Sequence, residues 1–206
     1  MKVLFVNGSP HEKGCTYTAL KEVADTLDQQ GIATEIMWLG KKPLAGCMGC
    51  GTCNTTGRCV FDDSVNDFCE ATAGVDGFIF GTPVHFAAAD GALTSFMDRA
   101  FFGGKAKVQG KPAAAVVSCR RGGASAAFDQ VNKYFTIKSM PVVSSQYWNQ
   151  VHGSTPADVR QDAEGLQTMR TLGNNMAWML KCIDAGKKAG ISFPTPEATI
   201  YTNFIR

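Results

Sequence analysis

The sequence lacks a long apolar run and lacks an excess of charge of either sign. Its 206 residues carry 20 Lys and Arg against 18 Asp and Glu, a net charge of +2. That balance gives no basic field for nucleic acid. No run reaches the roughly 18 apolar residues that a membrane-spanning helix needs. The opening residues suit a strand rather than a signal peptide. We therefore expect a cytoplasmic protein of one domain, residues 1–206, with neither nucleic acid nor a membrane as partner.

Two nucleotide-binding signatures are also missing. No Gly-x-x-x-x-Gly-Lys-Ser/Thr is present, because Lys13 precedes Gly14 and Cys15 follows it. The dinucleotide pattern Gly-x-Gly-x-x-Gly is absent as well. Triphosphate chemistry with Mg²⁺ and a Rossmann-type dinucleotide site are thereby disfavoured. No Ser/His/Asp set or carboxylate pair offers an alternative catalyst.

What the chain does have is an alternation of strand and helix patterns. Apolar or alternating segments predict strands at residues 2–6, 33–39, 77–81 and 112–119, with a short fifth strand beginning at 141–143. Apolar residues at helical spacing predict helices over residues 16–27, 62–73, 91–101, 125–135 and 156–185. This order predicts an α/β fold with a doubly wound, five-stranded parallel sheet. A cysteine-rich insertion follows strand two at residues 40–61, and residues 156–206 form a C-terminal helix and tail.

Three polar or glycine-containing loops follow predicted strands, at residues 8–18, 82–88 and 118–123. Ligands of such sheets bind outside the carboxyl ends of the strands, so these loops should meet at one crevice. The first loop offers hydroxyls and backbone N–H groups for a phosphate at a helix N-terminus. Its candidates are Ser9, Gly14, Cys15, Thr16, Tyr17 and Thr18. A monophosphate such as that of FMN fits this loop, and the alternative is that its Ser and Thr only cap the helix.

The second and third loops would surround a flat ring. The second supplies Thr82, Pro83, Val84, His85 and Phe86, and the third supplies Ser118, Arg120, Arg121, Gly122 and Gly123. His85 is a candidate proton donor, or else a surface histidine. Arg120 would stabilise negative charge on a reduced flavin or bind a nicotinamide phosphate, or else it is a solvated surface residue.

Four motifs together resemble the NAD(P)H-dependent FMN reductase family. They are Asn7-Gly-Ser-Pro with Gly14-Cys-Thr, Gly81-Thr-Pro-Val-His-Phe, Phe96-Met-Asp-Arg and Ser118-Cys-Arg-Arg-Gly-Gly. The chain resembles in particular the branch called iron–sulfur flavoproteins, over roughly residues 1–150. The resemblance implies a flavodoxin-like fold, FMN held by the three loops, and a homodimer or homotetramer. His11 departs from the family, which often has Arg at that position.

Four of the eight cysteines, Cys47, Cys50, Cys53 and Cys59, fall within thirteen residues. Four thiolates in a glycine-containing loop suit a [4Fe–4S] cluster, and the spacing matches the iron–sulfur flavoprotein motif. Zinc, a redox-active dithiol and a loop of free thiols remain as alternatives.

Tyr147 and Trp148 lie in an aromatic and polar segment, residues 144–152, that suggests a subunit interface. The alternative is that these two rings stack beside a flavin or its nicotinamide partner. The predicted function is an FMN-dependent oxidoreductase. Electrons would pass from NAD(P)H or a ferredoxin-like donor to a small-molecule or protein acceptor. The alternatives are a flavodoxin-like electron carrier and a thiol or metal redox sensor.

Overall fold

The computed structural model describes residues 1–103, 106–202 and 204. Its sheet contains β1 (Lys2–Asn7), β2 (Ala33–Trp38), β3 (Gly77–His85), β5 (Ala113–Cys119) and β6 (Gln150–His152). These strands lie in the order β2-β1-β3-β5-β6, and every neighbouring pair is parallel. The two residues of β4 (Ala88–Ala89) fold back antiparallel on the end of β3. The predicted five-stranded parallel sheet is confirmed.

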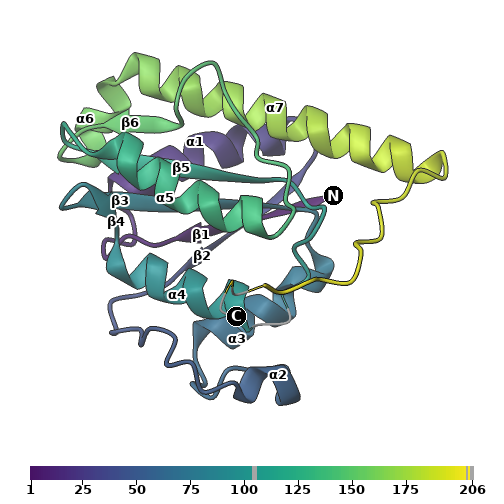
Figure 1. The fold of residues 1–206 in the computed structure, drawn as a ribbon. Coiled ribbons are helices and arrows are strands. Elements are labelled where there is room, and N and C mark those ends of the chain that lie inside the picture. The colour runs from purple at the N-terminus through teal and green to yellow at the C-terminus, as the bar shows by residue number, and fades with distance from the viewer. Residues whose placement is uncertain (104–105, 203, 205–206) are drawn as a thin grey trace.

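Helices cover both faces of the sheet (Figure 1). One layer holds α1 (Cys15–Gln29), α6 (Pro156–Gln161) and α7 (Ala163–Lys188), and the other holds α3 (Ser64–Ala71), α4 (Gly91–Phe102) and α5 (Ala124–Ile137). A short 3₁₀ turn, η1 (Thr72–Gly74), follows α3. The small helix α2 (Thr52–Thr56) lies at the edge of the molecule, well away from the sheet. In the described part of the chain, no helix combines the length and apolarity needed to cross a membrane.

Alternation along the strands divides the core between the two layers. In β1, Val3 and Phe5 pack toward α1 and α7, whereas Leu4 and Val6 pack toward α3, α4 and α5. Both sets are fully or almost fully buried, which explains why the strand reads as a continuous apolar run. Phe68 of α3 completes the second layer by packing on three further phenylalanines of β3 and α4.

Several predicted boundaries were wrong. The helix predicted over residues 156–185 is interrupted at Asp162. This residue ends α6 and its carboxylate caps the start of α7 by accepting from Gly165 N. The fifth strand does not begin at 141–143. Val142 makes only an isolated bridge to Ala113, and the paired strand is β6. Residues 82–85, predicted as loop, continue β3, and the cysteine-rich segment contains α2.

Candidate functional site

The three predicted loops meet at the carboxyl edge of the sheet. Gly8 N donates to Gly81 O at 2.9 Å, which joins the first loop to β3 directly before the second loop. The hydroxyls of Thr16 and Ser118, both buried, lie 2.8 Å apart and join the first loop to the third. The third loop touches the second at Gly123, where an added Cβ would lie 2.7 Å from Ala87 Cα.

The first loop leaves the N-terminus of α1 without a side-chain cap. Gly14 is the N-cap residue and accordingly makes no capping hydrogen bond. Thr18 Oγ1 instead donates to Gly14 O, and Ser9 Oγ accepts from His11 N. The alternative that these hydroxyls cap α1 is therefore wrong. N–H groups at the start of an uncapped helix are suited to an anion. Tyr17 lines a cavity of about 320 Å³ together with Trp38, and the lining of that cavity includes no residue of the second or third loop.

The second loop combines an ordered pair with strained backbone. His85 Nδ1 lies 2.9 Å from Oδ2 of the nearly buried Asp90, which leaves the other ring nitrogen of His85 available. Thr82 Oγ1 accepts from Asp90 N at 2.9 Å and fixes the same carboxylate-bearing residue. Phe86 and Ala87 follow with φ of 51° and 59°, values that non-glycine residues seldom adopt. Phe86 is fully exposed, and strained residues of this kind concentrate at functional sites.

The third loop exposes its two arginines to solvent and packs its last glycine against the second loop. Arg120 and Arg121 are exposed, while Ser118 is buried beneath them. Gly123 adopts φ +89° as the N-cap of α5, whereas Gly122 has free space where a Cβ would be. The printed contacts of Gly8, Thr16, Ser118 and Gly123 join the three loops at one edge of the sheet. The role of the predicted ring and phosphate residues in binding a flavin stays a prediction.

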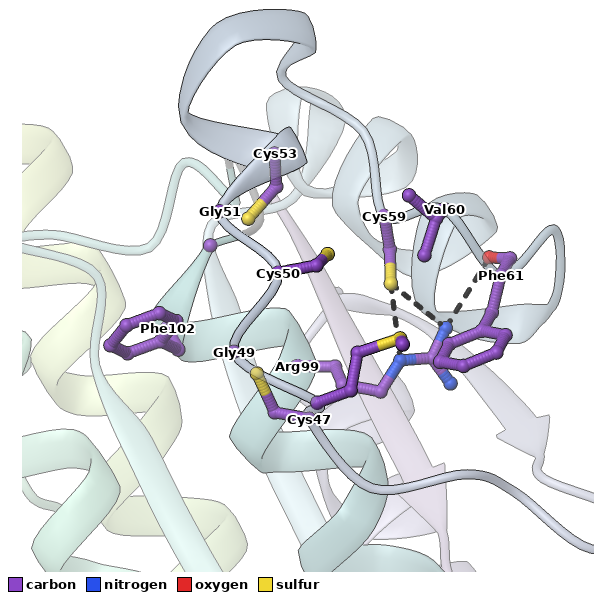
Figure 2. Close-up of a pocket in the computed structure, with 12 residues that line it drawn as sticks. Cys47, Gly49, Cys50, Gly51, Cys53, Cys59, Val60, Phe61, Arg99 and Phe102 are labelled. Carbon is purple, nitrogen blue, oxygen red and sulfur yellow. Dashed lines mark hydrogen bonds between the residues drawn. The ribbon is translucent and has the colours of Figure 1, made fainter.

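Figure 2 shows the second candidate site, a pocket lined by all four clustered cysteines. Cys47, Cys50 and Cys53 lie on one arm of the segment, and Cys59 lies on the facing arm. The space between them is about 20 Å³, room for a single water. Within residues 1–103, 106–202 and 204, no three His, Cys, Asp or Glu side chains are arranged to hold a metal ion.

The cysteines differ in their surroundings. Cys47 and Cys50 are exposed, and hydrogen bonds from Thr52 lower the pKa of the Cys50 thiol. Cys53 Sγ packs against Gly103, where an added Cβ would lie 1.9 Å from the sulfur. Outside this group, burial raises the pKa of Cys69 to about 11, which keeps that thiol protonated and unreactive at neutral pH.

Sequence reasoning missed the residues that hold this pocket together. Arg99 of α4 is buried and donates to Cys59 Sγ, yet its motif indicated no such role. The side-chain amide of Asn66 accepts from the backbone N–H of Cys59 and donates to its carbonyl. Asp63 caps α3 through Val65 N. Its pairing with Arg99 has no local signal in the sequence, because that contact joins residues 36 positions apart.

The aromatic segment before β6 lies near a further cavity. Tyr147 and Trp148 pack edge to face at 4.7 Å and are both half exposed. Tyr147 also lines a polar cavity of about 220 Å³ with His152 and Asp162. The predicted interface role of this segment stays a prediction.

A parallel sheet of this strand order, with helices on both faces, defines a flavodoxin-like fold. The chain belongs to the NADPH-dependent FMN reductase family, which matches residues 1–154. It is 34% identical over 193 residues to an iron–sulfur flavoprotein of Methanocaldococcus jannaschii, covering 89% of this chain and 99% of the relative. The resemblance to the FMN-binding oxidoreductases of this family is confirmed.

Solved structures agree on the fold. A flavodoxin from the domain Archaea superposes with a TM-score of 0.60 at 15% identity, over 88% of this chain and 99% of that one. An NAD(P)H:quinone oxidoreductase from Methanothermobacter marburgensis gives a TM-score of 0.64 at 14% identity, over 85% of this chain and 96% of that one.

Proposed function

We propose that the chain is a flavin oxidoreductase whose FMN lies at the edge where the three loops meet. The observation that carries the proposal is the junction of those loops through Gly8, Thr16, Ser118 and Gly123. The uncapped start of α1 would bind the phosphate, with hydroxyls from Ser9 and Thr18 nearby. The second and third loops would hold the ring from both sides.

His85 and Arg120 have separate roles in this proposal. Asp90 orients His85 through Nδ1, so the remaining ring nitrogen can hold or deliver a proton near the ring. Arg120 is exposed at the same edge and would place positive charge beside a reduced flavin or a nicotinamide phosphate. When bound, FMN supplies the hydride and electron chemistry, and these side chains supply orientation and charge.

We further propose that Cys47, Cys50, Cys53 and Cys59 hold a [4Fe–4S] cluster. The residues fit that group in kind and number, because four thiolate ligands line one pocket. The relative from Methanocaldococcus jannaschii is itself called an iron–sulfur flavoprotein. Glycines at positions 49, 51 and 57 take positive φ and allow tight wrapping of the loop. When bound, the cluster would carry single electrons.

The proposed donor is NAD(P)H or a ferredoxin-like protein, and the proposed acceptor is a small molecule or a protein. The proposed assembly is a homodimer or homotetramer in the cytoplasm. Exposed apolar side chains on α7 and the tail, such as Trp178 and Ile191, support association.

The cofactor test uses anaerobically purified protein. We expect flavin absorption, together with about four irons and as many sulfides per chain. Cys47→Ser should lose iron but keep FMN, whereas Cys182→Ser, at an exposed cysteine of α7, should keep both. Flavin without iron in the wild-type protein would refute the cluster. Absence of flavin, with no uptake of added FMN, would favour a thiol or metal sensor instead.

The donor test is a stopped-flow experiment. Rapid bleaching of the bound flavin by NADH or NADPH supports the reductase. If only a reduced ferredoxin bleaches it, the chain is an electron carrier instead. The near-neutral net charge of +2 favours the reductase, because carriers usually dock through a strongly charged surface.

A further inference from the structure

Arg99 occupies an unusual position for a charged residue. It lies on α4 and is only 3% exposed, so its guanidinium is removed from water. Burial of this kind disfavours the charged form, but the hydrogen bonds to Asp63 and Cys59 outweigh it and raise the pKa of Arg99. The guanidinium also lies over the Phe61 ring, 4.9 Å from its centroid. Burying an arginine is costly unless its charge is paired and its N–H donors form hydrogen bonds.

The donors of Arg99 reach both ends of the cysteine-rich segment. Nη1 donates to Ala45 O at 3.3 Å, two residues before Cys47, and Nη2 donates to Phe61 O at 3.3 Å, two residues after Cys59. Arg99 thereby closes the segment into a loop.

Asp63 balances the charge of Arg99 in a bidentate pair. Its carboxylate oxygens accept from Nη1 at 2.7 Å and from Nη2 at 2.9 Å. The geometry still leaves Nε and Nη2 pointing at Cys59 Sγ, each at 3.2 Å (Figure 2). Cys59 therefore receives two charge-assisted N–H donors on its sulfur.

The backbone of Cys59 is held as firmly as its sulfur. The buried Asn66 accepts from Cys59 N at 2.9 Å and donates to Cys59 O at 3.1 Å. Cys47 and Cys50, on the facing arm, are instead exposed and separated by Met48 and Gly49. The pocket thus has one wall held by side-chain hydrogen bonds and one exposed wall.

We propose that Arg99 is a positioning residue that presets Cys59 as the anchoring ligand and raises the reduction potential of the group held by the four cysteines. This inference rests on the proposed cluster. Hydrogen bonds to ligand sulfurs and nearby positive charge are recognised determinants of cluster potential. Both stabilise the reduced form, which carries the more negative charge. Loss of Arg99 should therefore lower the potential.

The test measures the midpoint potential of the reconstituted holoprotein by redox titration. Arg99→Met would leave Asp63 without its cation, so it is combined with Asp63→Asn, which keeps the cap of α3. The double variant should shift the one-electron equilibrium at least tenfold toward the oxidised form, about 59 mV lower. Arg99→Lys keeps a charge but has one donor atom, and its potential should fall by less.

The matched control is Arg58→Met. Arg58 is the residue before Cys59, but it is half exposed and pairs with Asp62 and Glu70 instead of a sulfur. Its loss should leave the potential unchanged. A lowered potential in the Arg99 variants alone, at wild-type iron content, supports the proposal.

Three outcomes would overturn it, and they differ. If the wild-type protein assembles a cluster and the Arg99 variants keep its potential, Arg99 only braces the loop and the proposed function stands. Loss of iron in the Arg99→Lys variant together with loss of folding, seen by circular dichroism, would equally assign Arg99 to bracing. If the wild-type protein takes up no iron, the proposed cluster fails first and this inference fails with it.

Discussion

Gly123 offers a sharp test of the proposed flavin edge, because a single methyl group at this position would wedge two of its loops apart. Its backbone has φ +89°, and a Cβ there would lie 2.7 Å from Ala87 Cα and 3.0 Å from Val84 Cγ1. The nearest neighbour is backbone, which cannot rotate aside as a side chain can. Gly123→Ala must therefore displace the second loop, the third loop or both.

The magnitude follows from two costs. A non-glycine residue held in a left-handed or similarly rare conformation costs about 1–3 kcal/mol. For a chain of this size, that loss corresponds to a fall in Tm of about 2–12 °C. Displacement of the loops adds a separate loss of FMN affinity. We expect it to be at least tenfold, which corresponds to about 1.4 kcal/mol.

The assay is quenching of FMN fluorescence on titration with the metal-free protein, together with thermal melts without flavin. Gly122→Ala is the matched control, since a Cβ at that neighbouring position meets nothing within 4 Å and its φ is not in the positive range. It should bind FMN as the wild type does. If Gly123→Ala binds FMN as tightly as Gly122→Ala, the two loops do not jointly hold the ring and the proposed site is wrong.

Three further predictions test neighbouring contacts. Asp90→Ala should lower stability by about 1 kcal/mol because the carboxylate caps α4 through Ala92 N, whereas Asp90→Asn should keep the cap; urea unfolding compares them. Thr16→Val should lower the free energy of unfolding by about 1–3 kcal/mol and weaken FMN binding, because it leaves the buried Ser118 hydroxyl unpaired. Thr16→Ser should restore the stability in urea unfolding and the affinity in the FMN titration. Burial raises the pKa of Cys69 from 9.0 to about 11, so the folded chain keeps a proton that the unfolded chain loses as pH rises. The free energy of unfolding should therefore fall between pH 9 and 11, by at most about 2 kcal/mol after solvent screening, and Cys69→Ala should remove that part of the slope in urea melts.

The fold could be predicted because its signals are local. The apolar run of β1 and the helical spacing of α1 each follow from neighbouring residues. Errors arose where a distant partner decided the outcome. Val142 has a strand-like sequence but finds only one bridge to Ala113, while residues 150–152 pair fully with β5. Asp162 breaks the last helical pattern because its carboxylate accepts from His152 N as well as capping α7.

The candidate sites divide in the same way. Loop residues such as Ser9 and Gly123 could be predicted because each follows a recognisable strand, and strand ends meet at one edge. Arg99 could not, since nothing local marks a buried arginine. Its four partners lie 36 to 54 positions earlier in the chain, and only the packing of α4 against α3 brings them together.

The helix α4 gives the two candidate sites a fixed relation within one chain. It begins at the proposed flavin edge, where Asp90 caps it and contacts His85, and Arg99 lines the cysteine pocket nine residues later. At 1.5 Å per residue those positions are about 14 Å apart along the axis. Phe96 and Met97 between them are fully buried, so the helix is anchored in the core. Any displacement of α4 at the cysteine pocket would therefore also disturb the proposed flavin edge, whereas Cys47 and Cys50 lie on an exposed arm outside this helix.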